Sequence, residues 1–231
     1  MTGVHVEERF EDAIEASMLA AGWHKGAPHD YRPDLGLDVE QLFAFIHATQ
    51  PTAWARILGY YGGDEGTGRA KFAQHLAQAI DQRGPLDVLR HGLKDHGVFV
   101  SLAFFAPAST LSAELVELHA ANRLSVTRQL RYSATTMDEL DLALFVNGIP
   151  TATAELKNPL TGQDVEHAKR QYREDRSPRE LLFAKRALVH FTVDPDLVFL
   201  TTRLAGRSTR FLPFNLGTGG PGNEGGAGNP A

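Results

Sequence analysis

Hydrophobic and polar residues alternate most regularly in the segment from Thr151 to Lys157. Two threonines, Glu155 and Lys157 occupy every second position, and alanines and a leucine fill the positions between them. A period of two is typical of a half-buried β-strand, so Glu155 and Lys157 are predicted to share one face of a sheet. The preceding segment, residues 140–146, is apolar apart from Asp141, which is typical of a strand buried on both sides.

Asn147-Gly148 separates these two segments and predicts a β-hairpin. The length of its turn decides whether Asp141 shares a face with Glu155, because a shift of one residue moves every side chain to the other face. A two-residue turn would pair Asp141 with Ala154, and the two carboxylates would then lie on opposite faces of the sheet.

We predict a three-residue loop, residues 146–148, whose last residue is a left-handed bulge. In this register Phe145 pairs with Ile149, and Asp141 lies opposite Thr153 and diagonal to the glutamate on the same face. A two-residue turn with no compensating bulge would contradict a shared site.

Two carboxylates and a lysine on one face form a candidate site for metal-dependent phosphodiester hydrolysis. Mg²⁺ binds oxygen ligands and keeps several waters, so Asp141 and Glu155 would suffice as its protein ligands. The cation would polarise a phosphate and activate a water, and Lys157 would orient that water or stabilise the growing negative charge. Charged residues two apart on a strand more often form a solvated face, and this alternative stays open.

Periodicity in the rest of the chain predicts a mixed α/β protein. Helices are expected at residues 7–22, 39–50, 52–61, 68–82, 86–91, 112–121 and 163–175, and further strands at residues 98–105, 125–132, 187–193 and 197–202. This order predicts one domain over residues 1–216, with a helical part to about residue 95 and a catalytic core from about residue 96. Seven of the fifteen residues from 217 to 231 are glycine, which predicts a flexible tail or linker.

Composition limits the classes of protein. The net charge of −5 is unlike that of a domain that wraps DNA, yet residues 163–210 contain 10 Lys and Arg against 7 Asp and Glu, whereas residues 1–100 contain 9 against 14. Weak intrinsic DNA affinity is therefore expected, with the basic surplus after the Glu155 strand. No segment approaches a membrane span, no secretory signal is evident and cysteine is absent, so a cytoplasmic location is predicted. His190 lies in an apolar strand and is expected in the core.

Long runs of the chain resemble one known family. They are ANRLSVTRQLRYS, DLALFVNGIP, ATAELKNPLTGQDVEHAKRQYREDRSPRELLF, LVHFTVD, LVFLTTRLAGRSTRFLPFN and GGAGNP, preceded by ATQPTAW and RGPLDVLRHGLKDHGV. They closely resemble the N-terminal region of the restriction (R) subunit of type I restriction-modification enzymes, over nearly the whole chain. The resemblance implies a PD-(D/E)xK restriction-endonuclease-like core with an N-terminal helical layer, in which Asp141, Glu155 and Lys157 match the catalytic motif residue by residue.

The resemblance also implies residues beyond this motif. Family members often carry an acidic residue on the first helix that joins the metal ligands; Glu11 and Glu15 are the candidates, and we favour Glu11. They also often carry a Gln-x-x-x-Tyr element on the helix after the Glu155 strand. Here Gln171 and Tyr172 are adjacent, so the pattern is displaced, but with the neighbouring basic residues they suit a DNA-facing helix. A solvated charged face is the more common alternative for any one of them.

Basic residues provide the remaining candidate DNA contacts. They are Arg173 on the same predicted helix, and Arg207 and Arg210 in the loop LAGRSTRF. A solvated loop that covers the sheet edge is an equally reasonable interpretation of the last two.

As a function, the resemblance implies a hydrolase acting on ester bonds, the Mg²⁺-dependent endonuclease domain of a type I site-specific deoxyribonuclease. Its expected partners are double-stranded DNA and the modification (methyltransferase) and specificity subunits. A complete R subunit also contains an ATP-dependent DNA translocase, but the phosphate-loop motif of such a motor is absent from this sequence, so ATP is not expected as its cofactor. Two alternatives stay open: a stand-alone PD-(D/E)xK nuclease in repair or defence, and a non-catalytic assembly module.

Overall fold

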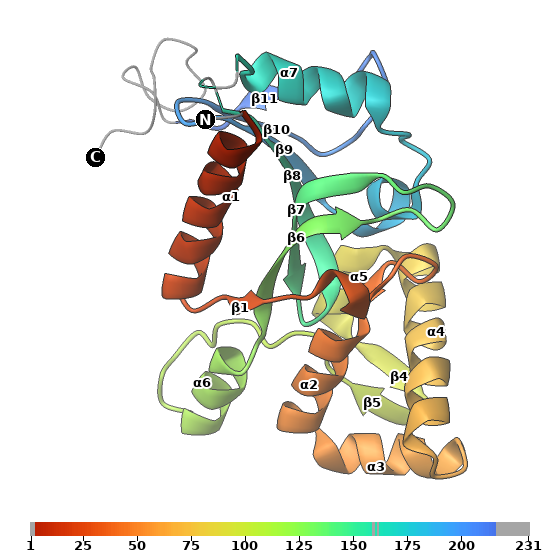
Figure 1. The fold of residues 1–231 in the computed structure, drawn as a ribbon. Coiled ribbons are helices and arrows are strands. Elements are labelled where there is room, and N and C mark those ends of the chain that lie inside the picture. Colours follow the sequence, from red (N-terminus) through yellow and green to blue (C-terminus); the bar gives the residue numbers. More distant parts are fainter. Residues whose placement is uncertain (1–2, 159, 161, 216–231) are drawn as a thin grey trace.

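A computed structural model describes residues 3–158, 160 and 162–215, and it shows a mixed seven-stranded sheet with helices on both faces (Figure 1). The sheet order is β1-β6-β7-β8-β9-β10-β11. Only the neighbours β1–β6 and β8–β9 are parallel among these described strands. The strands are β1 His24–Lys25, β6 Leu124–Arg131, β7 Glu139–Val146, β8 Ile149–Leu156, β9 Val189–Val193, β10 Val198–Thr201 and β11 Leu212–Pro213. The predicted α/β class is therefore confirmed.

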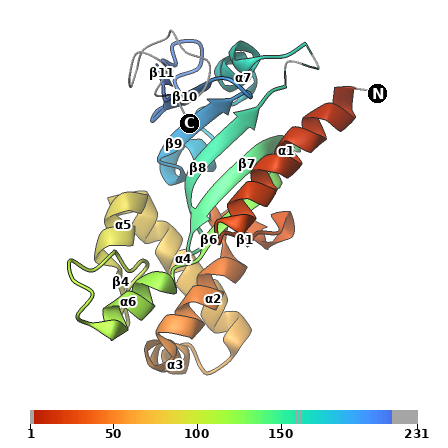
Figure 2. The same cartoon turned by 90° about the vertical axis from the view of Figure 1, so that its left-hand side faces the viewer.

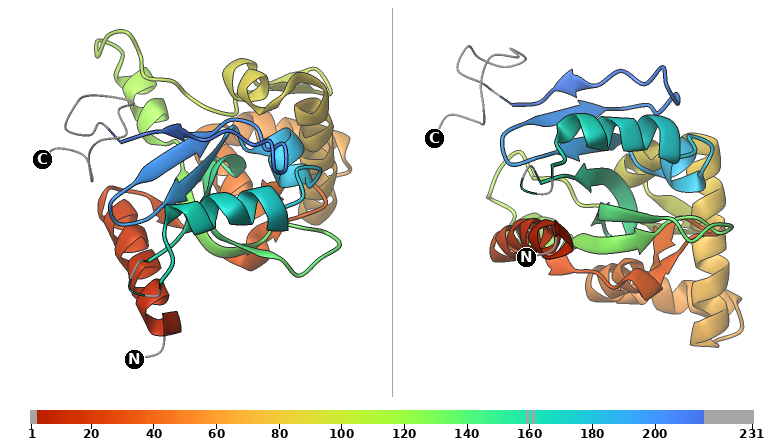
Figure 3. Two further views of the ribbon diagram at one scale, coloured as in Figure 1. Left: turned by 90° about the horizontal axis from the view of Figure 1, so that it is seen from above. Right: turned by 45° about the horizontal axis from the view of Figure 1, so that its top comes forward.

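Two helices cover the two faces of this sheet. The first, α1 (Gly3–Ala20), runs along one face, where Phe10, Ile14 and Met18 pack on an apolar cluster that includes Leu142 (Figure 2). The second, α7 (Val165–Arg170), lies over the other face and continues as a π-helix, η3 (Gln171–Asp175) (Figure 3). The structure thus places α1 with the sheet, whereas the predicted division near residue 95 put it in the helical part.

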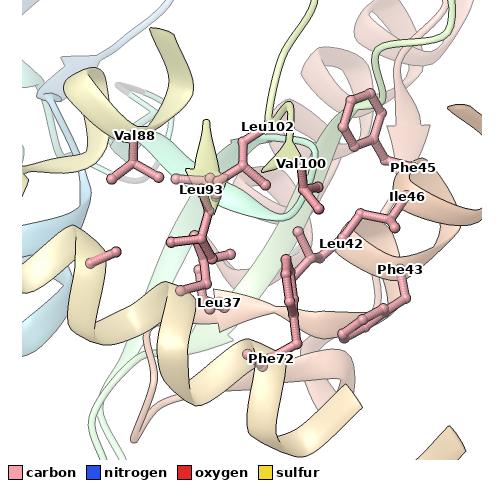
Figure 4. Packing of buried hydrophobic residues seen from close by; sticks show 14 of the residues in the cluster. Leu37, Leu42, Phe43, Phe45, Ile46, Phe72, Val88, Leu93, Val100 and Leu102 are labelled. Carbon is pink, nitrogen blue, oxygen red and sulfur yellow. The ribbon is translucent and has the colours of Figure 1, made fainter. Parts of the chain in front are cut away.

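A helical unit lies at the end of the sheet remote from α7. Its helices are α2 (Val39–Thr49), α3 (Pro51–Tyr60), α4 (Glu65–Arg83) and α5 (Pro85–His91). The hairpin β2 (Tyr31–Arg32)–β3 (Leu37–Asp38) precedes them in the chain, and the hairpin β4 (Leu93–Asp95)–β5 (Val98–Val100) follows them. Their core contains Leu42, Phe43, Phe72 and Val100 (Figure 4). Ile149 of β8 belongs to the same core, so the unit is packed directly on the β7–β8 hairpin.

Three short helices complete the described chain: η1 (Pro28–Asp30), α6 (Ala113–Ala120) and η4 (Leu182–Arg186), the last a π-helix. Most predicted elements match observed ones, but the strand expected at residues 98–105 ends at Val100. Beyond it, the Ser101 N–H donates to the Gln50 side chain at 2.7 Å and the Phe104 N–H to the Asn122 side chain at 3.0 Å. Side chains therefore satisfy this backbone in place of a neighbouring strand. The predicted glycine-rich tail, residues 217–231, lies outside the described residues.

The loop predicted for the β7–β8 hairpin is wrong. Val146 pairs with Ile149, so Asn147 and Gly148 form a two-residue turn, with φ angles of 51° and 79°. Both values lie in the left-handed region that a type I′ turn requires, which is the conformation that Asn-Gly favours in two-residue hairpins.

A β-bulge next to the turn restores the predicted face. Phe145 pairs with Pro150 but Leu144 pairs with Ala152, so Thr151 is the extra residue. Pro150 has no N–H for the ladder, and the Thr151 hydroxyl donates to the Leu144 carbonyl at 3.2 Å. The bulge shifts the register by one residue and thereby brings Asp141 to the face that carries Glu155.

Candidate active site

The candidate site lies where β7 and β8 separate. Their last ladder pair is Leu142 with Ala154, and one residue further Asp141 and Glu155 occupy facing positions. Asp141 Oδ2 accepts a hydrogen bond from the Leu156 N–H at 2.7 Å. A carboxylate thus replaces the backbone acceptor that a continued ladder would supply, and it fixes Asp141 against β8.

Lys157 follows directly after the end of β8. Its Nζ lies 3.8 Å from Asp141 Oδ2, and its side chain is 10% exposed. Its backbone N–H donates to the Val193 carbonyl of β9 at 2.9 Å, which fixes the residue at the end of the strand. Lys157 and Gln171 also line a cavity of about 360 Å³ between the end of β8 and the α7–η3 helix. The lysine therefore lies between the carboxylates and an open space.

Glu155 is fully buried. Its Oε1 accepts a hydrogen bond from Arg176 Nε at 2.7 Å, whereas its Oε2 has no hydrogen-bond partner among the described residues. Burial, reinforced by the charge of Asp141, raises the pKa of Glu155 to about 8, although the Arg176 guanidinium acts in the opposite direction. A buried carboxylate oxygen without a partner is unfavourable in the protein alone and is the kind of atom that a divalent cation would coordinate.

The chemistry of the donor set fits a hydrated Mg²⁺ ion. Asp141 and Glu155 offer hard carboxylate oxygens from facing positions, and Mg²⁺ binds through one or two carboxylates with water in its other positions. A group of three or more potential metal ligands is not found in the described part of the chain. Asp141 and Glu155 are the two carboxylates that occupy facing positions beyond the last ladder pair.

Glu11, the predicted third ligand, has other partners in the structure. Its carboxylate accepts hydrogen bonds from Arg128 Nη2 and Gln129 Nε2, both at 3.0 Å. Burial raises the pKa of Glu11, with the charge of Asp141 contributing. Glu15, the alternative, pairs with Lys25 at 2.8 Å. Glu11 is thus near enough to Asp141 for their charges to interact, and its role as a ligand remains a prediction.

Arg176 is a site residue that the sequence analysis missed. It is 8% exposed, and besides Glu155 it contacts the Glu139 carbonyl, to which Nη2 donates at 2.6 Å. Its guanidinium also lies 5.6 Å from the ring centroid of Tyr132. In the sequence Arg176 follows the predicted helix within the charged run REDRS, which indicates a solvated segment. No periodicity marks it as buried.

The prediction that Tyr172 contacts DNA is wrong for this structure. Tyr172 is fully buried, and its hydroxyl lies 2.8 Å from Thr153 Oγ1. Gln171, its neighbour, is partly exposed and lines the cavity next to Lys157. Successive helical residues point in different directions, so only Gln171 faces the cavity while Tyr172 enters the core.

The arginines predicted to bind DNA have different environments. Arg173 Nε donates to the Thr209 carbonyl at 3.2 Å, and its guanidinium lies 5.3 Å from the Phe211 ring centroid, so it anchors the loop to η3. Arg207 is 87% exposed and lies 3.6 Å from Glu174, and Arg210 is exposed. The loop therefore presents Arg207 and Arg210 to solvent beside the helix that borders the cavity.

The fold and the site together define a mixed α/β protein with a nuclease-like arrangement, in which two carboxylates and a lysine meet at the ends of two central strands. Residues 112–211 match the family model for the type I restriction enzyme R protein N terminus. This segment contains Asp141, Glu155, Lys157 and Arg176 but not Glu11, and it is less than half of the chain. Over it, the resemblance seen in the sequence is confirmed.

Comparison with curated proteins gives no match. Within the residues that the structure describes, no helix has the length and apolar character needed to cross a membrane.

Proposed function

We propose that this chain is the Mg²⁺-dependent endonuclease domain of a type I restriction enzyme R protein and that it hydrolyses phosphodiester bonds of double-stranded DNA. One observation carries the proposal: Asp141, Glu155 and Lys157 converge where β7 and β8 separate. The family match over residues 112–211 supports a role in restriction, and such a role favours DNA as the substrate class.

Each residue of the site has a distinct task in this proposal. Asp141 and Oε2 of Glu155 would hold the cation. When bound, Mg²⁺ supplies a Lewis acid that polarises the scissile phosphate and makes a bound water more acidic. Lys157, next to Asp141 and open to the cavity, orients the attacking water or stabilises the negative charge that grows on the phosphate.

The DNA backbone would approach along the cavity between the end of β8 and the α7–η3 helix. Gln171 borders this cavity, and the exposed Arg207 and Arg210 lie on the loop that Arg173 anchors beside it. Contacts of this type position the phosphate backbone and read no sequence. We propose that the specificity and modification subunits supply sequence recognition.

Cleavage of supercoiled plasmid by the purified chain, with Mg²⁺ or with EDTA and with or without the partner subunits, tests the proposal. We expect Mg²⁺-dependent nicking that falls about 100-fold or more in Asp141→Asn and Lys157→Ala, because each change removes a charge from the reacting centre. The carboxamide oxygen introduced by Asp141→Asn can still accept from the Leu156 N–H, so the fold should be retained. Circular dichroism checks this.

Lys94→Ala is the matched control, since Lys94 is an exposed strand lysine in the helical unit. Its nicking rate should equal that of the wild type. Nicking that persists in EDTA, or that survives both site substitutions, would contradict the proposed nuclease. Normal assembly and unchanged restriction with either substitution would instead favour the non-catalytic assembly module.

A further inference from the structure

The buried guanidinium of Arg176 joins the two strands that carry the candidate metal ligands. Its Nε donates to Glu155 Oε1 on β8 at 2.7 Å, and its Nη2 donates to the Glu139 carbonyl on β7 at 2.6 Å. These contacts lie just beyond the last β7–β8 ladder pair, Leu142 with Ala154. Arg176 thus bridges the strands at the point where backbone pairing between them ends.

We propose that Arg176 is a positioning residue that holds Glu155 so that only Oε2 is presented to the metal. The inference rests on the proposed function, because it takes Glu155 as a metal ligand. Oε1 is engaged by the guanidinium, and Oε2 has no hydrogen-bond partner in the described residues. Glu155 therefore binds the cation through one oxygen while Arg176 fixes the rotation of its carboxylate.

The position of Arg176 is itself fixed by its surroundings. Its backbone N–H donates to the Gln171 carbonyl at 3.1 Å, which closes the last turn of η3. The Tyr132 ring lies against its guanidinium, with 5.6 Å between the guanidinium carbon and the ring centroid. A π-turn in a helix often marks a functional position, and here the π-helix ends directly before Arg176, the residue that bridges the strands.

Lysine should not replace this arginine. The two hydrogen bonds leave from different nitrogens of one rigid, planar group, and they meet acceptors on different strands. A lysine ammonium keeps the positive charge but is a single donor atom on a flexible chain. Arg176→Lys thus keeps a positive charge next to Glu155 but removes the planar group that orients the Glu155 carboxylate.

Arg186 provides a matched control within the same chain. It is 1% exposed, and it also bridges a carbonyl and a carboxylate: Nε donates to the Leu35 carbonyl at 2.9 Å and Nη1 to Asp81 at 2.7 Å. It contacts neither Asp141 nor Glu155 in the structure. Arg186→Lys therefore reports the cost of losing a buried arginine bridge away from the site.

Calorimetric titration with Mn²⁺ alone, in the absence of DNA, tests the inference independently of cleavage. We expect the Kd for Mn²⁺ to rise about 10-fold or more in R176K, the effect typical of losing a partner that orients a metal ligand. R186K should bind Mn²⁺ as the wild type does. Circular dichroism and thermal melting of each variant show whether it is folded.

The outcomes separate the two proposals. If the wild type binds Mn²⁺ and R176K binds it equally well, Arg176 has no positioning role and the metal site stands. If the wild type binds no Mn²⁺, both the metal site and the role of Arg176 are overturned. Should R176K not fold, a crystal structure of the wild type with Mn²⁺ decides: Glu155 bound through one oxygen with Arg176 in place supports the inference, and bidentate Glu155 with Arg176 displaced overturns it.

Discussion

His190 shows how single buried side chains support the site from behind. It is fully buried on β9, and its Nδ1 lies 2.7 Å from Thr153 Oγ1, which also contacts the Tyr172 hydroxyl. Burial lowers the pKa of His190 to about 4. The residue is therefore neutral in the folded protein at neutral pH, as expected for a core histidine.

This low pKa predicts a pH-dependent loss of stability. Between about pH 6.5 and pH 4 the unfolded chain binds a proton at His190 that the folded chain does not, so the free energy of unfolding falls as the pH falls through this window. The integrated effect is on the order of 3 kcal/mol and does not grow below the folded pKa. Urea unfolding at several pH values measures it.

His190→Gln is the variant that isolates this contribution, because its amide can still hydrogen-bond to Thr153 but does not titrate. The difference in unfolding free energy between the wild type and H190Q should change by about 3 kcal/mol between about pH 6.5 and pH 4. Carboxylates titrate in both proteins and cancel in the difference. Parallel stability curves for the two proteins would show that His190 is not the group responsible.

For single residues, the sequence predicts the environment correctly where a hydrophobic pattern indicates burial. Alternation along β8 was enough to predict that Glu155 and Lys157 share a face, and an apolar strand context was enough for His190. No such pattern indicates that Arg176 is buried, or that Tyr172 is buried whereas Gln171 is partly exposed. Their environments depend on the π-turn at residues 171–175 and on contacts with β7 and β8, which are distant in sequence.

Among the helices and strands, most were predictable, but the β7–β8 hairpin was not predictable in detail. Asn-Gly is compatible with both two-residue and three-residue loops. Asp141 lies on the predicted face of the sheet, although the predicted pairing of the strands was wrong. The observed bulge at Thr151 places Asp141 on the same face as Glu155, and the bulge expected at Gly148 would have done the same. Which position bulges depends on Pro150 and on the helical unit that packs over the turn.

Packing over this turn predicts a large effect of Gly148→Ala. A Cβ at Gly148 would lie 2.2 Å from the Asp38 carbonyl oxygen and 2.7 Å from the Leu42 nitrogen, and the residue has a φ of +79°. The variant must therefore strain the turn and also push α2 away from β8. We expect a loss of about 3 kcal/mol or more in the free energy of unfolding, measured with urea.

Gly97→Ala is the control for backbone strain alone. Gly97 has a φ of +82°, and a Cβ there would meet nothing within 4 Å. It should cost only the left-handed conformation, about 1 kcal/mol. Equal losses in the two variants would mean that the contact between the turn and α2 contributes little.

Across the whole molecule, fewer basic residues are available to contact DNA than the sequence indicates. Of the ten basic residues between 163 and 210, Lys169, Arg176 and Arg186 are buried and ion-paired. They cannot contribute to a DNA-binding surface in this structure. With a net charge of −5, the isolated chain should bind DNA weakly, which agrees with the proposal that partner subunits supply sequence recognition.

The remaining exposed arginines near the cavity lead to a prediction for DNA binding. Arg207 and Arg210 are solvent-exposed on the loop beside η3, and each would neutralise about one phosphate. In the double variant R207A/R210A we expect several-fold weaker binding of a short duplex. The slope of log Kd against log salt concentration should also fall by about two. Fluorescence anisotropy in Ca²⁺, over a series of salt concentrations, measures both quantities without requiring cleavage.

Arg56→Ala controls for a general loss of positive charge. Arg56 is an exposed arginine on α3, in the helical unit at the opposite end of the molecule from α7 (Figure 1). A phosphate path along the cavity predicts that R56A keeps the wild-type affinity and salt slope. If R56A weakens binding as much per charge as R207A/R210A does, the DNA does not follow the proposed path, and the interaction reflects net charge alone.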